Sequence, residues 1–104
     1  AEAGDLQSVI FETYGPGGIG IIIDALTDNN NRTSAEIRHL LSKAGTSLAA
    51  PGSVSWNFTK NKEDNSWEPN TTMELSDEDI EKLGRLVDTI EEHDDVQEVF
   101  TSAE

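Results

Sequence analysis

Residues 19–26, IGIIIDAL, constrain the fold more than any other part of the sequence. This nearly continuous apolar run has the length of a strand and is typical of a strand buried on both faces of a sheet. Residues 8–14, SVIFETY, also have the composition of a strand, and the break at 15–18, Gly-Pro-Gly-Gly, separates the two runs. The pattern leaves the neighbour of strand 8–14 open, and a hairpin with 19–26 is the simplest arrangement.

Two amphipathic helices are predicted, one after Thr33 and one after Ser76. Thr33 is followed by Glu36 at the spacing of a capping box. Ser76 precedes three acidic residues, which the helix dipole favours in a first turn. Gly84 lies inside the second helix, and we interpret it as a point of close packing against a sheet. The two apolar stripes consist of Ile37, Leu40, Leu41 and Ala44, and of Ile80, Leu83, Val87 and Ile90.

Three further strands are predicted at 53–59, 71–75 and 96–101. Alternation in 53–59 places Trp56 on the inner face with two other apolar residues, so we expect Trp56 in the core. Residues 61–70 form a polar connector, in which Trp67 either packs over a sheet edge or contacts a partner.

The order of these elements predicts a fold class. From residue 19 onward it is β-α-β-β-α-β, the ferredoxin-like pattern. We therefore predict one α+β domain over 1–104. It should have an antiparallel sheet with both helices on one face, plus an extra N-terminal strand.

The formal charge of -14 limits the partners of this chain. Residues 1–60 carry four basic and six acidic side chains, whereas residues 61–104 carry three and fifteen. Such an acidic surface repels phosphate backbones, so any contact with nucleic acid must use a local basic patch in the first half. The simpler interpretation of most of these charges is a solvated face that keeps the domain soluble.

Several other classes are disfavoured by composition. The chain has no cysteine, which excludes disulfides and thiolate zinc sites, and it has no run of roughly 18 to 20 apolar residues that could cross a membrane. The start AEAGDLQ lacks the features of a secretory signal. Because position 1 is not Met, we expect a processed or excised chain.

Two groups of residues are candidates for binding. The Gly-rich segment after Tyr14 could be a tight turn or a rigid contact loop, and it does not suit a phosphate loop because it leads into a strand and no lysine follows. Basic residues on and just before the first helix could be a solvated surface or a patch that contacts phosphate, to which asparagines at 29–31 could add hydrogen bonds. The candidate contact residues are Tyr14, Gly15, Gly17, Gly18, Asn29, Asn31, Arg32, Arg38, His39 and Lys43.

The sequence gives little indication of a catalytic site or a metal site. The two histidines are too few for a metal site without cysteine, although His93-Asp94-Asp95 could hold a cation weakly. No serine lies in a Gly-x-Ser-x-Gly elbow. Asp24 and Asp28 have no second group placed to form an acid–base pair. We therefore expect no catalytic residue, no metal and no cofactor.

Several blocks of sequence resemble the YebC/PmpR family, which includes the mitochondrial translational activator of cytochrome oxidase. The YGPGGI and LTDN-x-NRT blocks at this spacing are specific. The resembling residues are 14–19, 25–29, 31–33, 36–39, Lys43, 52–54 and 94–97, with Val99 and Ala103.

The resemblance implies the central domain of a longer protein. Family members are about twice this long, carry a basic N-terminal helical domain, and have another domain inserted between the two middle strands. Here that place holds only the connector 61–70, so the chain resembles the central domain alone, excised or engineered by closing the gap.

The resemblance also implies a non-enzymatic role, for which three hypotheses stay open. One is a translation factor that contacts the ribosome and its RNA, in the bacterial cytoplasm or the mitochondrial matrix. The second is a transcriptional regulator that binds duplex DNA as a full-length protein. The third is a spacer without a ligand of its own. No membrane contact is expected, and a monomer is favoured.

Overall fold

A computed structural model describes residues 6–104. Residues 1–5, on which the expectation about a secretory signal largely rests, lie outside the described part. The helices and strands are β1 (Gln7–Tyr14), η1 (Pro16–Gly18), β2 (Gly20–Thr27), α1 (Asn30–Lys43), η2 (Ser55–Asn57), β3 (Phe58–Lys60), β4 (Trp67–Pro69), α2 (Asp77–Glu91) and β5 (Val96–Thr101), where η marks a 3₁₀ turn. In the part of the chain that is described, no helix is long and apolar enough to span a bilayer.

The main sheet has three antiparallel strands in the order β1-β2-β5. β1 and β2 form the expected hairpin, with Gln7 opposite Thr27 and Tyr14 opposite Gly20. β2 is therefore the central strand, as its apolar run predicted. β3 and β4 form a separate two-stranded hairpin.

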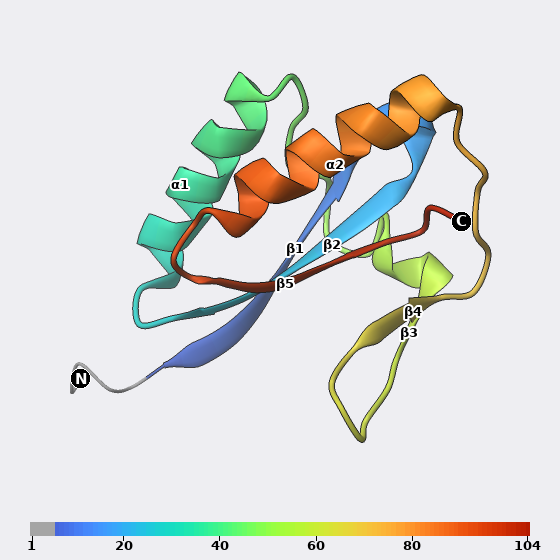
Figure 1. The fold of residues 1–104 in the computed structure, drawn as a ribbon. Coiled ribbons are helices and arrows are strands. Elements are labelled where there is room, and N and C mark those ends of the chain that lie inside the picture. The colour runs from blue at the N-terminus through green and yellow to red at the C-terminus, as the bar shows by residue number, and fades with distance from the viewer. Residues whose placement is uncertain (1–5) are drawn as a thin grey trace.

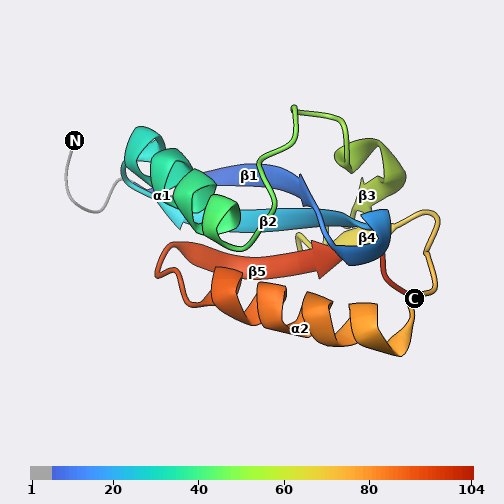
Figure 2. The same ribbon diagram turned by 90° about the horizontal axis from the view of Figure 1, so that it is seen from above.

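The two faces of β2 are buried by different parts of the chain. Both helices cover one face (Figures 1 and 2), where Ile21, Ile23 and Ala25 pack with Ile37 and Leu41 of α1 and with Leu83 and Ile90 of α2. On the other face, Ile22 packs with Val54 and Phe58. The α+β class, the antiparallel sheet and the placement of both helices on one face are confirmed.

The predicted strand 53–59 is largely a turn. Residues 55–57 form η2, and only residues 58–60 form a short strand. The Glu12 carboxylate accepts hydrogen bonds from the backbone N–H groups of Gly52, Val54 and Ser55 at 2.9, 2.8 and 2.7 Å. A side chain thus satisfies the amides that a strand would have used in a ladder. Trp56 is 74% exposed, so its predicted place in the core was wrong.

The predicted strand 71–75 is also absent, because these residues form no continuous series of strand hydrogen bonds. Its only strand-like pairing is an isolated parallel bridge between Met73 and Ala103. Residues before it belong instead to β4, inside the predicted connector, where Trp67 packs against the second core cluster. The main sheet consequently has three strands, because residues 58–60 pair with β4 and residues 71–75 remain irregular.

Helix α1 begins earlier than predicted. Asn29, not Thr33, is its N-cap, and the Asn29 side chain accepts a hydrogen bond from the Arg32 N–H at 3.1 Å. The predicted cap of α2 is confirmed, since the Ser76 hydroxyl accepts from the Asp79 N–H at 3.2 Å. Gly84 faces open space, with nothing within 4 Å of the place where a Cβ would lie, so its interpretation as a packing point was wrong.

Candidate nucleic-acid interface

The Gly-rich turn is held rigidly between β1 and β2. Gly17 and Gly18 have φ values of 74° and 85°, a region that glycine adopts without strain. The Gly18 N–H donates to the Gly15 carbonyl at 3.0 Å, and the Thr46 hydroxyl donates to the Tyr14 carbonyl at 2.9 Å. The turn is therefore tied to the segment that follows α1, and it leads into strand β2 as the sequence predicted.

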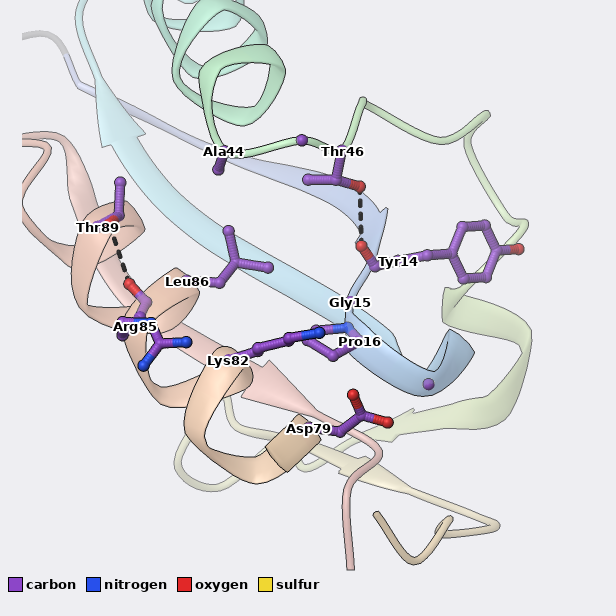
Figure 3. Close-up of a pocket in the computed structure, with 12 residues that line it drawn as sticks. Tyr14, Gly15, Pro16, Ala44, Thr46, Asp79, Lys82, Arg85, Leu86 and Thr89 are labelled. Atoms are coloured by element: carbon purple, nitrogen blue, oxygen red, sulfur yellow. Dashed lines mark hydrogen bonds between the residues drawn. The ribbon is translucent and has the colours of Figure 1, made fainter. Parts of the chain in front are cut away.

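A groove runs from this turn along the side of α2 that faces the end of α1. It consists of two adjoining cavities of about 650 and 450 Å³, both lined by Ala44 and Thr89. We call it the α1–α2 groove. Figure 3 shows the larger cavity, with the Gly-rich turn on one side and the side chains of α2 on the other. Its acidic, basic and histidine lining residues are His39, Lys43, Asp79, Lys82, Arg85, Glu92 and His93.

Cations from both helices line the α1–α2 groove. Lys43 and His39 come from α1 and make no ion pair within residues 6–104. Lys82 and Arg85 come from α2 and pair along the helix with Glu78 at 3.7 Å and Glu81 at 3.3 Å. These pairs are exposed and therefore weak, so both cations can turn towards a ligand.

Sequence reasoning missed Lys82 and Arg85. Both lie in residues 61–104, where fifteen acidic side chains outnumber three basic ones and the net charge hides a local basic face. Their spacing of three residues nevertheless places them on one face of α2. A helical projection of residues 77–91 would have shown them together.

Arg32 is engaged in an ion-pair network instead of facing solvent freely. Its guanidinium lies 2.9 Å from both Asp95 and Glu36, and 3.6 Å from Asp28. The hydrogen bond to Asp95 raises the pKa of Arg32. The pKa of Asp95 is lowered by the hydrogen bond that the Thr33 hydroxyl donates at 2.7 Å and by Arg32. Arg32 thus braces α1 against the turn before β5.

The oxygen and nitrogen atoms of Glu36, His93 and Asp95 lie within 4.8 Å of one another, a spacing that could suit a cation. The Asp95 N–H donates to His93 Nδ1 at 3.1 Å, so neutral His93 carries its proton on Nε2 and donates it to Glu36 at 2.7 Å. Arg32 donates to the same Glu36 Oε1 and to Asp95 Oδ2, each at 2.9 Å. The cationic partner of both carboxylates is therefore Arg32, and the cluster acts as a structural brace.

The other predicted contact residues do not form one patch. Asn29 caps α1, and Asn31 is exposed in the first turn of α1. Arg38 lines a third cavity on the opposite side of α1, beside β1. The fold brings together Tyr14, Gly15 and Gly17 with His39 and Lys43, and it separates them from Arg32 and Arg38.

Comparison with known proteins agrees with the resemblance noted in the sequence. The family profile described as "TACO1/YebC second and third domain" matches residues 6–63 and 59–103. The chain belongs to the TACO1/YebC family.

Relatives and a solved structure cover nearly the whole chain. It is 33% identical to a probable transcriptional regulatory protein of Thermoanaerobacter pseudethanolicus, over 96% of this chain and 65% of that protein. A probable transcriptional regulatory protein of Caldanaerobacter subterraneus is 34% identical, over 95% of this chain and 65% of its own length. The crystal structure of a conserved hypothetical protein from Aquifex aeolicus matches with a TM-score of 0.84 and 25% identity, over 100% of this chain and 67% of that chain.

The chain corresponds to only part of these longer relatives. The chain spans slightly less than two thirds of the relatives that it matches. The match in three dimensions confirms the α+β fold.

Proposed function

We propose that this TACO1/YebC chain is a non-enzymatic domain of a regulator of gene expression, and that it contacts ribosomal RNA through the α1–α2 groove. The observation that carries the proposal is the groove itself, which places the Gly-rich turn beside Lys43, Lys82 and Arg85. Cations on two facing helices can neutralise neighbouring phosphates of one strand.

The geometry of the groove suits a folded RNA surface. The turn is rigid, so its backbone can approach a sugar–phosphate chain without first being ordered. The strong negative charge of residues 61–104 would repel RNA elsewhere on the molecule and restrict contact to the groove. A ribosome also offers basic proteins that can meet the acidic surface.

A second candidate function is regulation of transcription by binding DNA. The names of the relatives from Thermoanaerobacter and Caldanaerobacter support it. The net charge of -14 argues against strong binding of duplex DNA by this chain alone. In this alternative, DNA binding would require the basic domain that the resemblance places before this chain in longer family members. A spacer role without a ligand is the third candidate.

Co-sedimentation with ribosomes at about 0.15 M salt tests the proposal, because charges further apart than about 8 Å are screened there. The test variant is Lys43→Glu with Lys82→Glu. The matched control is Lys60→Glu with Lys62→Glu, which makes the same charge change in the β3–β4 hairpin. Arg32 is left intact, since its ion pairs brace the fold.

We expect the groove variant to lose ribosome binding and the hairpin variant to keep it. Equal loss in both variants would show a general charge effect and contradict the assignment to the groove. A duplex-DNA shift assay runs alongside. Binding to DNA alone would favour the transcriptional role, and binding to neither would favour the spacer.

A further inference from the structure

The outer edge of β1 has backbone groups that face away from the sheet. The Glu12 carbonyl accepts a hydrogen bond from the Ala49 N–H at 2.7 Å, so the backbone of Glu12 points away from β2. Successive residues of an antiparallel strand alternate in this direction, which turns the N–H and C=O groups of Ser8 and Ile10 outward as well. Within residues 6–104, these groups have no backbone partner.

A cavity of about 510 Å³ lies beside this open edge. One wall is β1, and the other is the face of α1 that carries Asn30, Ser34 and Arg38 at intervals of four residues. Arg38 is exposed and makes no ion pair with another described residue. The edge thus combines unpaired backbone groups with an unpaired cation.

Part of the same edge is already covered by an extended segment of the chain itself. Leu48 forms an antiparallel bridge with Thr13, and the next residue, Ala49, donates to Glu12. The chain then turns away at 51–54, where the Glu12 carboxylate holds the turn through three backbone amides. The pairing stops with the rest of β1 still open (Figure 2).

We propose that an extended peptide segment from a partner protein adds to β1 as a fourth strand of the sheet, opposite residues 7–11. Its backbone would pair with the outward groups of Ser8 and Ile10. A single Asp or Glu on the side facing α1 would meet Arg38, and the rest of the segment would be uncharged. This site lies across α1 from the α1–α2 groove and does not depend on the RNA-binding proposal.

The negative charge of the chain favours a weakly charged peptide at β1 over a second copy of the chain or a strongly acidic segment. A second copy of the chain would bring together two molecules of charge -14, which opposes association through β1. A strongly acidic segment would be repelled for the same reason. The Glu12 carboxylate beside the cavity is already bound by backbone N–H groups, so one carboxylate opposite Arg38 can be accommodated.

Two synthetic peptides test the proposal by fluorescence anisotropy. Both are seven residues long, capped at each end, and alternate threonine and valine; one has a central aspartate and the other a central lysine. We expect the aspartate peptide to bind about fivefold more tightly, the upper range for an exposed ion pair. Arg38→Glu should reverse the preference. Ser8→Pro removes an outward N–H and should weaken binding of the aspartate peptide about fivefold.

Ser8→Ala is the control, because it keeps the backbone N–H and should bind like the wild type. Amide chemical shifts should move at Ser8 and Ile10 when the peptide binds. The proposal is overturned if neither peptide binds, if shifts appear only at β5, or if Arg38→Glu leaves the preference unchanged. Concentration-dependent dimerisation with shifts at the same amides would assign the edge to a second copy and would also overturn it.

Discussion

Glu12 is a buried acid whose role could not be read from its place in a strand. It is only 8% exposed, and its carboxylate binds the amides of Gly52, Val54 and Ser55. Burial raises its pKa, but the hydrogen bonds from Gly52, Ser55 and Val54 together outweigh burial and hold the pKa below the ordinary value of 4.5. One side chain of β1 therefore fixes the turn that precedes β3.

The lowered pKa of Glu12 predicts a dependence of stability on pH. A carboxylate with a lowered folded-state pKa stabilises the fold above its ordinary pKa of 4.5, and this contribution is lost as the pH falls through the folded-state value. Glu12→Gln places an amide NH₂ against backbone donors and should lower the free energy of unfolding by about 2 kcal/mol at neutral pH.

Urea unfolding at several pH values measures this contribution. The difference between Glu12→Gln and the wild type should shrink as the pH falls below 4.5. Glu98→Gln, at an exposed position of β5, is the control and should change little. Equal stability of Glu12→Gln and the wild type at neutral pH would contradict this account of the turn.

At the scale of elements, α2 is stabilised both by local capping signals and by packing against the sheet. Its Ser76 cap and its acidic first turn stabilise the helix end without help from the rest of the fold. Leu83 and Ile90 attach it to the sheet. Gly84 contributes neither to the helix cap nor to the packing. It is exposed, and a Cβ there would have no neighbouring atom within 4 Å.

Gly84→Ala is therefore expected to stabilise the domain by up to about 1 kcal/mol, because alanine loses less backbone freedom in a helix. Gly20→Ala is the opposite case: a Cβ there would lie 2.7 Å from Val54 Cγ1, so we expect destabilisation. Thermal unfolding of both variants measures the two effects. A lower melting temperature for Gly84→Ala would show a packing role that the structure lacks.

At the scale of the whole molecule, we propose that the β3–β4 turn marks the place where longer relatives carry an inserted domain. The two parts matched by the family profile meet at 59–63. Alignments with the Thermoanaerobacter and Caldanaerobacter proteins run over 159 and 158 positions, although this chain has 104 residues. Lys60 pairs with Trp67 across the turn. The two ends of an inserted domain would therefore be attached to neighbouring positions of the β3–β4 hairpin.

This arrangement predicts that the turn tolerates insertion. A folded domain placed between Glu63 and Asp64 should change the free energy of unfolding of the host by about 1 kcal/mol or less, because loop-closure entropy grows slowly with length. The same insertion between Gly17 and Gly18 should unfold the host, since a Cβ on Gly17 would already lie 2.6 Å from Leu75. Chemical unfolding of the two fusions measures the difference. Equal tolerance at both places would contradict the proposal.

Much of the fold was predictable because its signals are local. The apolar run of β2, the break at 15–18 and the Ser76 cap each act within a few residues, and the structure confirms all three. Part of the candidate site was predictable for the same reason, as the Gly-rich turn and the cations of α1 stand out in the sequence. Their function stays a prediction.

The sequence by itself therefore determined the α+β class, the central strand and the existence of both helices, because periodicity and capping are properties of neighbouring residues. Only the tertiary structure decided that Trp56 is exposed, that Arg32 is tied to Asp95, and that Lys82 and Arg85 join the α1–α2 groove. Each of these depends on residues far along the chain: Glu12 for the turn that carries Trp56, Asp95 for Arg32, and the Gly-rich turn for Lys82 and Arg85. Contacts between residues so far apart in the chain produce no repeating pattern of residue types, so sequence periodicity does not predict them.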